Sequence, residues 1–332
     1  MTALGIGAPS ARGALSVQNL KRRIPLLLFL LLLVFLSVRA PAFLEPSNIL
    51  ASLVQAAPIA IVSFGLAAVV IGGGDDAVAG GIDLSIPASA ALATAIVSDQ
   101  LTNAGAGIVQ AFLLALAAVL VVGVVNAVLV TVVGLPSILS TLATYATVVG
   151  VIRVVTVNRR INVDHPAILS IRDGNLLGIP AAVVIALVLF AGFAFLMHRT
   201  PYGMHVQAVG GSRDAAESSG LKPSRYIAST FLLGAVAAAF ASLVLTARGS
   251  GMSPGIQDRL MIDMVLATFL GASFSPRNVV TVQGALLGAI LVAFMSNGLI
   301  LMRVDNSWVD GAKGALILIV VASAALQNRR RS

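Results

Sequence analysis

The sequence predicts an all-α protein: a polytopic membrane bundle of about ten transmembrane helices with both termini in the cytoplasm. Two observations predict this fold class. Only 10% of the 332 residues are charged and the mean hydropathy is +1.00, whereas about a quarter of residues carry charge in soluble domains. The apolar residues also form unbroken runs such as IALVLFAGFAFLM, instead of the alternating pattern of a membrane barrel. We therefore expect helices and no sheet.

Ten segments satisfy the length rule for a transmembrane helix, which is about 20 mostly apolar residues and fewer where a helix is surrounded by others. The third, eighth and tenth are the shortest. The first follows the basic run KRR but lacks a small-residue cleavage pattern, so we interpret it as a span and not as a signal peptide. The ten segments are residues 24–40, 49–71, 84–98, 108–133, 136–156, 178–198, 227–247, 260–272, 278–297 and 312–326.

Lysine and arginine in the short loops predict the orientation of the chain. With ten spans and a cytoplasmic N-terminus, the cytoplasmic segments hold twelve of the 21 basic residues but only five of the 13 acidic ones. Cytoplasmic tails at 1–23 and 327–332 then flank a membrane domain at 24–326. The twelve basic residues are Arg12, Lys21, Arg22, Arg23, Arg199, Arg213, Lys222, Arg225, Arg277, Arg329, Arg330 and Arg331.

The composition excludes several classes of function. The chain has no cysteine, which excludes disulfides, thiol catalysis and cysteine-bound metals. None of its three histidines, His165, His198 and His205, has a second metal-type ligand three or four positions away, so no metal site is expected. The basic residues do not form a stripe with aromatics between them, so no nucleic acid is expected. No nucleophile, base and orienting acid can be brought together, which argues against an enzyme.

One polar, glycine-bracketed segment, VQAVGGSRDAAESSGL at 206–221, interrupts the apolar sequence. The predicted topology places it in a cytoplasmic loop at 199–226. Ser212 is a favourable N-cap, Asp214 suits the positive end of a helix dipole, and Gly220 is a typical helix stop. The segment therefore predicts a helix of about two turns, which is too short to be stable alone in water.

This short helix has two interpretations. The first is a solvated loop with a chance helical turn, and the second is a helix that docks on a cytoplasmic partner. Small side chains on one face would let another surface approach closely, while Arg213 and Glu217 offer charges at its edge. The residues expected on the small face are Ala215, Ala216 and Ser219.

Three stretches resemble one family of membrane proteins. GGIDLSIPASAALATAI at 80–96 is similar to the GGIDLS signature of the sugar-type permeases of ATP-binding-cassette (ABC) importers, which include ribose, xylose and galactose permeases. YGMHVQAVGGSRDAAESSGLKPSRY at 202–226 resembles the cytoplasmic loop of that family, and GALLGAILVAFMSNGL at 284–299 continues the match. The resemblance covers most of residues 49–328.

The chain departs from the family pattern in two loops. GGGDDAVAG at 72–80 expands the segment before GGIDLS and contains Asp75 and Asp76, and GASFSPRN follows the eighth span where the family often has GGTSLSGG. The expansion is rich in glycine, but it lacks G-x-x-x-x-G-K-[ST] and a nearby lysine. We therefore do not expect this chain to bind ATP.

The resemblance implies a permease subunit in the bacterial cytoplasmic (inner) membrane that moves a monosaccharide or a related polar solute inward. It implies cytoplasmic ABC ATPase subunits that bind the ATP, and a periplasmic solute-binding protein. It also implies a second permease subunit, which is either identical to this chain or different from it, and membrane lipid around both. The chain itself needs no cofactor. In that family the loop after the sixth span carries a coupling helix that sits in a groove of the ATPase. The corresponding residues are Gly210, Gly211, Ser212, Arg213, Asp214, Ala215, Ala216, Ser219 and Gly220.

Four polar residues are candidates for the translocation path: Asp83, Ser85, Asn126 and Asn297. An amide offers donors and acceptors to a hydroxyl-rich solute, and an acid within a span usually faces a cavity or a partner. Simpler interpretations remain open for all four. Asp83 and Ser85 also suit the N-cap region of the third span, and amides in membrane helices often bond neighbouring helices.

Charged residues are predicted on the outer side as well. Arg259 and Asp263 stand four residues apart, so an ion pair within one helix is expected. The outer loop at 157–177 is charged enough to meet a binding protein, and a merely solvated loop explains its charge equally well.

Two other functions remain as alternatives. One is a secondary transporter or channel that works without ATP, which charge pairs embedded in the spans or an ion-binding helix break would favour. The other is a branched-chain amino acid ABC permease, over which the GGIDLS signature favours the sugar branch.

Overall fold

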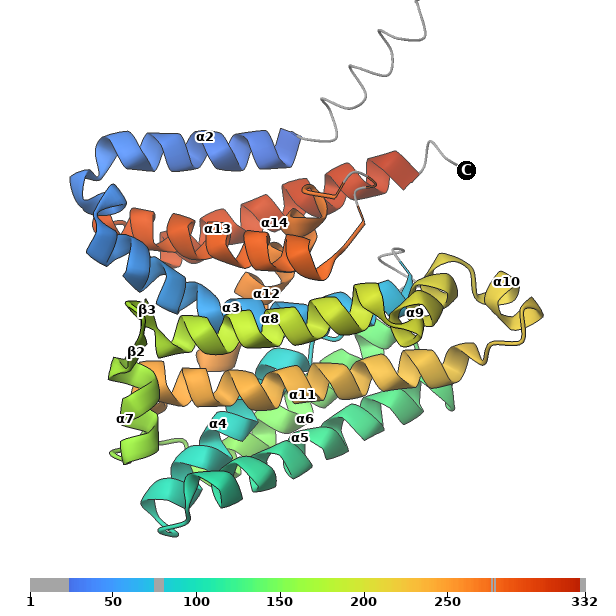
Figure 1. Ribbon diagram of the computed structural model, residues 1–332, viewed down its shortest axis with the longest axis horizontal. Helices are drawn as coiled ribbons and strands as arrows, with labels where there is room; N and C mark the ends of the chain where they lie inside the picture. The colour runs from blue at the N-terminus through green and yellow to red at the C-terminus, as the bar shows by residue number, and fades with distance from the viewer. Residues whose placement is uncertain (1–23, 75–80, 276, 278, 329–332) are drawn as a thin grey trace, which may run out of the picture.

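The computed structural model describes residues 24–74, 81–275, 277 and 279–328. Most of its long helices run side by side along the longest axis of the molecule (Figure 1). These helices are α2 (Ile24–Arg39), α3 (Pro46–Gly73), α4 (Ile86–Thr102), α5 (Ile108–Thr131), α6 (Ser137–Thr156), α8 (Ala181–Arg199), α11 (Pro223–Gly249), α12 (Ile256–Ala272), α13 (Val282–Leu301) and α14 (Asn306–Asn328).

Each of the ten predicted spans falls on one of these helices, so the helical fold is confirmed. Within the described ranges, six helices are long and apolar enough to cross a membrane: α3, α5, α6, α8, α11 and α13. Helices α2, α4 and α12 have only 16, 17 and 17 residues. The count of ten spans therefore stays a prediction.

Short elements connect the long helices. They are the 3-10 helix η1 (Pro41–Leu44) and the helices α7 (Pro166–Asp173), α9 (Pro201–Gly211) and α10 (Arg213–Ser218). The expectation of no sheet is wrong in one detail. Strand β1 (Ile161–Asn162) pairs antiparallel with β4 (Gly251–Met252), and β2 (Asn175–Leu176) pairs with β3 (Ile179–Pro180). These two-residue pairs satisfy backbone groups where the chain leaves its helices.

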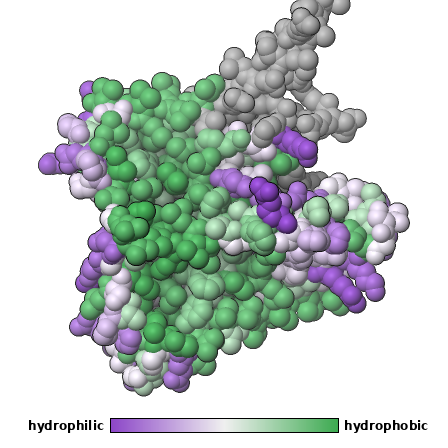
Figure 2. Space-filling view, viewed as in Figure 1, coloured by the Kyte–Doolittle hydropathy of each residue, from purple (hydrophilic) through white to green (hydrophobic). Residues whose placement is uncertain are grey.

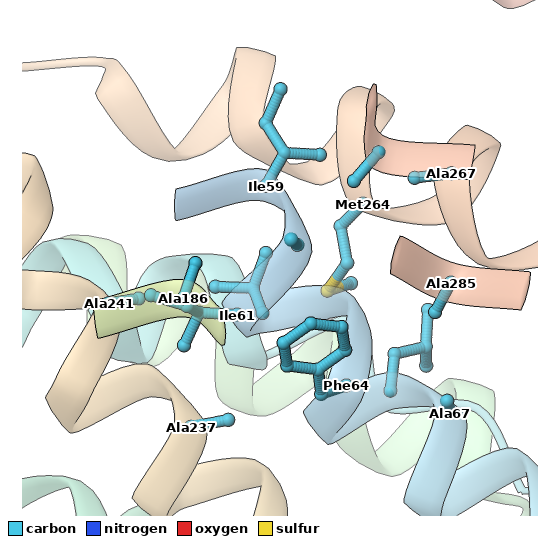
Figure 3. Packing of buried hydrophobic residues seen from close by; sticks show 14 of the residues in the cluster. Ile59, Ile61, Phe64, Ala67, Ala186, Ala237, Ala241, Met264, Ala267 and Ala285 are labelled. Carbon is cyan, nitrogen blue, oxygen red and sulfur yellow. The ribbon is translucent and has the colours of Figure 1, made fainter. Parts of the chain in front are cut away.

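The core of the bundle forms around α3. Its side chains Ile59, Ile61 and Phe64 are almost completely buried, and Figure 3 shows them facing small or flexible residues of α8, α11, α12 and α13. The surrounding residues are Ala186, Ala237, Ala241, Met264, Ala267 and Ala285. Small residues let helix backbones approach closely, and this close packing is the main attraction between helices inside a membrane.

The crossing of α12 and α13 is a close contact of this kind. A Cβ atom added at Gly288 of α13 would collide with the backbone carbonyl of Ala267 in α12. Any larger residue at position 288 would therefore separate the two helices.

A hydrophobic band surrounds the bundle. Figure 2 shows it as a broad apolar surface between two more polar ends. Large apolar side chains stay exposed on this surface, for example Val121 of α5, Leu139 and Val154 of α6, and Val188 and Phe195 of α8. An apolar surface of this extent requires lipid or another protein to cover it.

The two ends of the bundle carry different elements. In Figure 1, α9 and α10 lie at the right-hand end, and α14 ends on the same side of the molecule. Helix α7 and the β2–β3 pair lie at the opposite end. We call these the α10 end and the α7 end.

Candidate functional site

The polar segment that interrupts the apolar sequence forms two consecutive helices at the α10 end. The predicted cap is confirmed: the Ser212 hydroxyl accepts a hydrogen bond from the backbone N–H of Ala215 at 3.3 Å, and α10 begins at Arg213. After the last residue of α10, Gly220 adopts a φ of 84°, a conformation that glycine takes without strain. The helix-stop role of Gly220 is thus also confirmed.

Helix α9 was not predicted. Its own start signal is the pair Thr200–Pro201: the Thr200 hydroxyl accepts from the Gly203 N–H at 3.2 Å, and Pro201 occupies the first turn. Threonine followed by proline is a typical helix start, so the signal was present in the sequence. Gly210 and Gly211 consequently end α9 and do not form a loop before α10.

The predicted small face of α10 is wrong. Ala216 is 4% exposed and packs with Val209 of α9 and Ile227 of α11, whereas Ala215 and Ser219 are exposed. Successive helical residues point about 100° apart, so Ala215 and Ala216 face different directions. Only the outer side of α10 is therefore available to a partner.

Helices α9 and α10 are attached to the bundle by close contacts. A Cβ atom at Gly210 would collide with the carbonyl of Ile71 near the end of α3. The Arg213 guanidinium donates to the Gly73 carbonyl at 3.4 Å. These contacts mean that a displacement of α10 acts directly on α3, the helix at the centre of the core.

Helix α9 is also bonded to α11 through two polar pairs. The Tyr202 and Ser229 hydroxyls are 2.7 Å apart, and the Tyr226 hydroxyl lies 2.9 Å from His205 Nδ1. Helices α9 and α10 are thus attached both to α3 and to α11.

Three of the four predicted path residues meet inside the bundle. Ser85 donates to Asp83 Oδ1 through its hydroxyl at 2.6 Å and its backbone N–H at 2.8 Å, and Asn126 Nδ2 donates to the Ser85 hydroxyl at 2.7 Å. All three are at most 2% exposed. Asn126 Oδ1 has no partner among the described residues. The group is compatible with both earlier interpretations, since Asp83 accepts from the Ser85 N–H just before α4 begins and Asn126 bonds a neighbouring segment.

The fourth predicted residue lies elsewhere. Asn297 of α13 is half-buried and donates from Nδ2 to the Ser52 hydroxyl of α3 at 2.8 Å. It makes no hydrogen bond with the other three candidates within the described part of the chain. The sequence alone could not separate these positions, because their partners are far away along the chain.

A cavity of about 610 Å³ opens between α3, the last residues of α11 and α13 and the first turns of α12 and α14. We call it the outer cavity. Its lining combines apolar residues with Gln55, Arg248, Ser253, Arg259, Asp263, Ser296, Asn306, Asp310 and Lys313. A volume of this size suits a small organic solute.

The ion pair expected within α12 is wrong. Asp263 instead pairs with Lys313 of α14 at 2.7 Å, and Arg259 pairs with Asp310 of α14 at 3.4 Å. Lys313 and Asp263 are both buried. The sequence analysis missed Lys313, although a lysine inside an apolar segment indicates a buried partner. Arg259 and Asp263 of α12 therefore each pair with a residue of α14 and not with each other.

The segment 157–177, which was predicted to be a charged outer loop, contains α7 and lies at the α7 end. Arg160 donates to the Ser253 hydroxyl at 2.8 Å and to the Gly249 carbonyl at 2.7 Å. Arg172 donates to Asp173, and this hydrogen bond holds the pKa of the Asp173 carboxyl below its usual value. Part of the charge of this loop is thus used within the chain.

Asp75 and Asp76, in the expansion at 72–80, lie outside the residues that the structure describes. No group of acidic residues and histidines that could hold a metal ion occurs in the described ranges.

Comparisons with known proteins place the chain among transport proteins. A family model described as the permease component of branched-chain amino acid transport systems matches residues 48–321. The chain is 30% identical to a ribose import permease protein of Bacillus subtilis over 310 residues, which are 93% of this chain and 92% of that protein.

Two further relatives carry similar names. An L-arabinose ABC transporter permease protein of Azospirillum brasilense is 27% identical over 328 residues, covering 98% of this chain and 94% of that protein. A xylose transport system permease protein of Escherichia coli is 31% identical over 153 residues, covering 46% of this chain and 39% of that protein. No solved structure matches the chain.

Proposed function

The chain belongs to the family of permease components of branched-chain amino acid transport systems, and on this premise we propose that it carries a monosaccharide or a related polar solute inward. It is a membrane permease subunit of an ABC importer and not an enzyme, since ATP hydrolysis belongs to a separate ATPase subunit. The relatives named for ribose, L-arabinose and xylose support a sugar as the solute.

The observation that carries the mechanism is the exposed helix α10. Its exposed residues include Asp214, Ala215, Glu217 and Ser219, while Arg213 donates to the Gly73 carbonyl of α3 and Ala216 packs on α9 and α11. We assign Gly210 to Gly220 as the coupling segment, and the exposed side of α10 as the surface that docks on the ATPase. Movement of the ATPase would then reach α3 through α10 and α9.

A substitution on the outer side of α10 tests the docking surface. Ala215→Arg adds bulk and charge at an exposed position without disturbing the core, so we expect loss of solute-stimulated ATP hydrolysis with normal membrane insertion. Ala215→Ser, which adds little bulk and no charge at the same exposed position, is the matched control and should keep full activity. Ala216→Arg is unsuitable because Ala216 is buried. Full ATP-coupled uptake by the Ala215→Arg variant in vesicles would refute the assignment.

The proposal includes a topology and a set of partners. We propose ten spans at 24–326 in the bacterial inner membrane, with the tails at 1–23 and 327–332 and the α10 end in the cytoplasm. A solute-binding protein would then meet the α7 end, and the exposed apolar surface would face lipid and a second permease copy. In Figure 1, α14 ends on the same side of the molecule as α10, which supports this arrangement.

The translocation path remains part of the proposal. We assign Asp83, Ser85 and Asn126 to it because they form a hydrogen-bonded polar group buried inside the bundle, and Asn297 because its neighbour Ser296 lines the outer cavity. Asn297 gives the cleaner test, since it is only half-buried. Asn297→Leu should slow uptake without reducing the amount of folded protein, and an unchanged rate would remove Asn297 from the path.

One observation favours the alternative of an ATP-independent transporter. The buried pair Lys313–Asp263 is a charge pair within the bundle, which is typical of proton- or ion-coupled carriers. Uptake assays with the purified chain in liposomes separate the two functions. An ABC permease should move no solute without its ATPase, whereas a secondary transporter should respond to an imposed ion gradient.

The family description supports a second alternative, a branched-chain amino acid as the solute. Competition by leucine or by ribose against ATP-coupled uptake separates this solute from a sugar.

A further inference from the structure

The outer cavity carries an inference about the solute, and this inference rests on the proposed function. The cavity lies at the α7 end, because Gly249 in its lining precedes Ser250, which accepts a hydrogen bond from Arg172 of α7. It reaches solvent, because the side chain of Arg259 in its lining is 63% exposed. It is also enclosed enough to strengthen charge interactions, because Lys313 and Asp263 in its lining are buried.

The charges of the cavity lining do not cancel. Arg248, Arg259 and Lys313 are cationic, and only Asp263 and Asp310 are anionic. Lys313 lies 2.7 Å from Asp263 and 3.7 Å from Asp310, and Arg259 lies 3.4 Å from Asp310. Both carboxylates are therefore engaged with cations. The exposed side chain of Arg248 forms no close ion pair or hydrogen bond with any residue in the described ranges, so its guanidinium is open to an incoming anion.

The rest of the lining suits hydroxyl groups but not the flat face of a sugar ring. Gln55, Ser253, Ser296 and Asn306 supply neutral donors and acceptors. None of the lining residues is aromatic, so the stacking platform on which neutral sugars often bind is missing. A neutral sugar would make no use of the Arg248 charge.

We propose that the outer cavity receives an anionic polyhydroxy solute, such as a sugar acid, whose carboxylate pairs with Arg248. A guanidinium matches a carboxylate with two parallel hydrogen bonds. An amino acid is disfavoured as the solute, because Asp263 and Asp310 already pair with cations and no other carboxylate of the lining could bind its ammonium group. Arg248 is thus assigned as the residue that selects the charge of the solute.

Binding of a matched pair of solutes to the purified full-length permease tests this proposal. D-Galacturonate and D-galactose differ only in a carboxylate in place of a CH₂OH group, and their affinities can be compared by saturation-transfer NMR at constant ionic strength. We expect galacturonate to bind about tenfold more tightly, as for a hydrogen bond between charged groups. Arg248→Gln should abolish this preference, and Arg248→Lys should keep most of it.

Arg159→Gln serves as the control, because Arg159 is exposed outside the cavity. It should leave the preference unchanged. Equal affinity for both solutes, no binding of either, or an unchanged preference in Arg248→Gln would each overturn the proposal. These outcomes do not bear on the proposed function, which is tested by ATP-coupled uptake. A permease that imports a neutral sugar with its ATPase but shows no preference for the acid would keep its function and lose this inference.

Discussion

Asn126, Ser85 and Asp83 form a relay of hydrogen bonds in which each residue donates to the next. A polar atom buried without a partner costs more free energy than the net gain from one hydrogen bond. The stability of this group therefore depends on all three members. At the residue scale, this relay and the contact at Gly210 are the positions where a single substitution has the clearest consequence.

Asn126→Leu removes the donor to the Ser85 hydroxyl while keeping a similar side-chain volume. We expect the free energy of unfolding to fall by about 1–3 kcal/mol, measured by titration with SDS in mixed micelles. Asn103→Leu is the control, because Asn103 also donates a side-chain hydrogen bond, to Asp99 at 2.7 Å, but is exposed. Equal effects of the two substitutions would show that burial of the relay does not matter.

Gly210→Ala tests the attachment of α9 to α3. The new methyl group would meet the carbonyl of Ile71, and overpacking of this kind costs about 1–3 kcal/mol. The adjacent Gly211→Ala is a matched control, because a Cβ atom there has open space around it. Thermal unfolding in detergent should show a lower midpoint for Gly210→Ala alone. A similar midpoint for both variants would contradict the close contact.

At the scale of elements, neighbouring residues set where α10 starts and stops, whereas contacts with distant helices set the orientation of α10 and the position of α14. The start and stop of α10 are local, since Ser212 and Gly220 lie beside the helix that they delimit. Its orientation is not local, because Ala216 is buried by Val209 and Ile227 of two other helices. Helix α14 is positioned against α12 by two ion pairs that cross between the helices.

The two ion pairs between α12 and α14 should differ in their contribution to stability. Lys313→Met leaves the buried Asp263 without its partner, so we expect a loss of about 3 kcal/mol or more. Arg259→Met breaks a pair in which the arginine is 63% exposed, and a loss of at most about 1 kcal/mol is expected. SDS titration compares both variants with the wild type. A larger loss for Arg259→Met would reverse the assignment of the buried pair.

At the scale of the whole molecule, the two ends of the bundle differ in their functional elements. The α10 end carries the exposed helix that we propose docks on the ATPase, and the outer cavity opens toward the α7 end. Figure 2 shows the apolar band between them. A permease needs this polarity, because the motor and the solute act from opposite sides of the membrane.

Single cysteines test which side each end faces, and the natural chain has no cysteine, so no background must be removed. Ser218→Cys in α10 and Ala104→Cys after α4 are both at exposed positions. In intact cells an impermeant maleimide should label Cys at position 104, and position 218 only after permeabilisation. Labelling of position 218 in intact cells would contradict the cytoplasmic docking of α10.

Much of the fold could be predicted because it depends on local patterns. Apolar runs located all ten long helices, and cap and stop residues located α10. Helix α9 was missed although Thr200 and Pro201 signalled its start. The small face assigned to Ala215, Ala216 and Ser219 was wrong, because a local pattern does not tell which side of a short helix is covered.

The sequence by itself determined the membrane class of the protein, the positions of its helices and the family to which it belongs, since hydropathy, capping and motifs are properties of neighbouring residues. Only the tertiary structure decided which polar groups meet. In the structure Asn126 bonds Ser85, 41 positions away in the sequence, whereas Asn297 bonds Ser52 instead. Asp263 pairs with Lys313 and not with Arg259, the partner predicted from the sequence. The physical reason is that buried charges and amides take the closest partner in space, and packing between distant helices sets that distance.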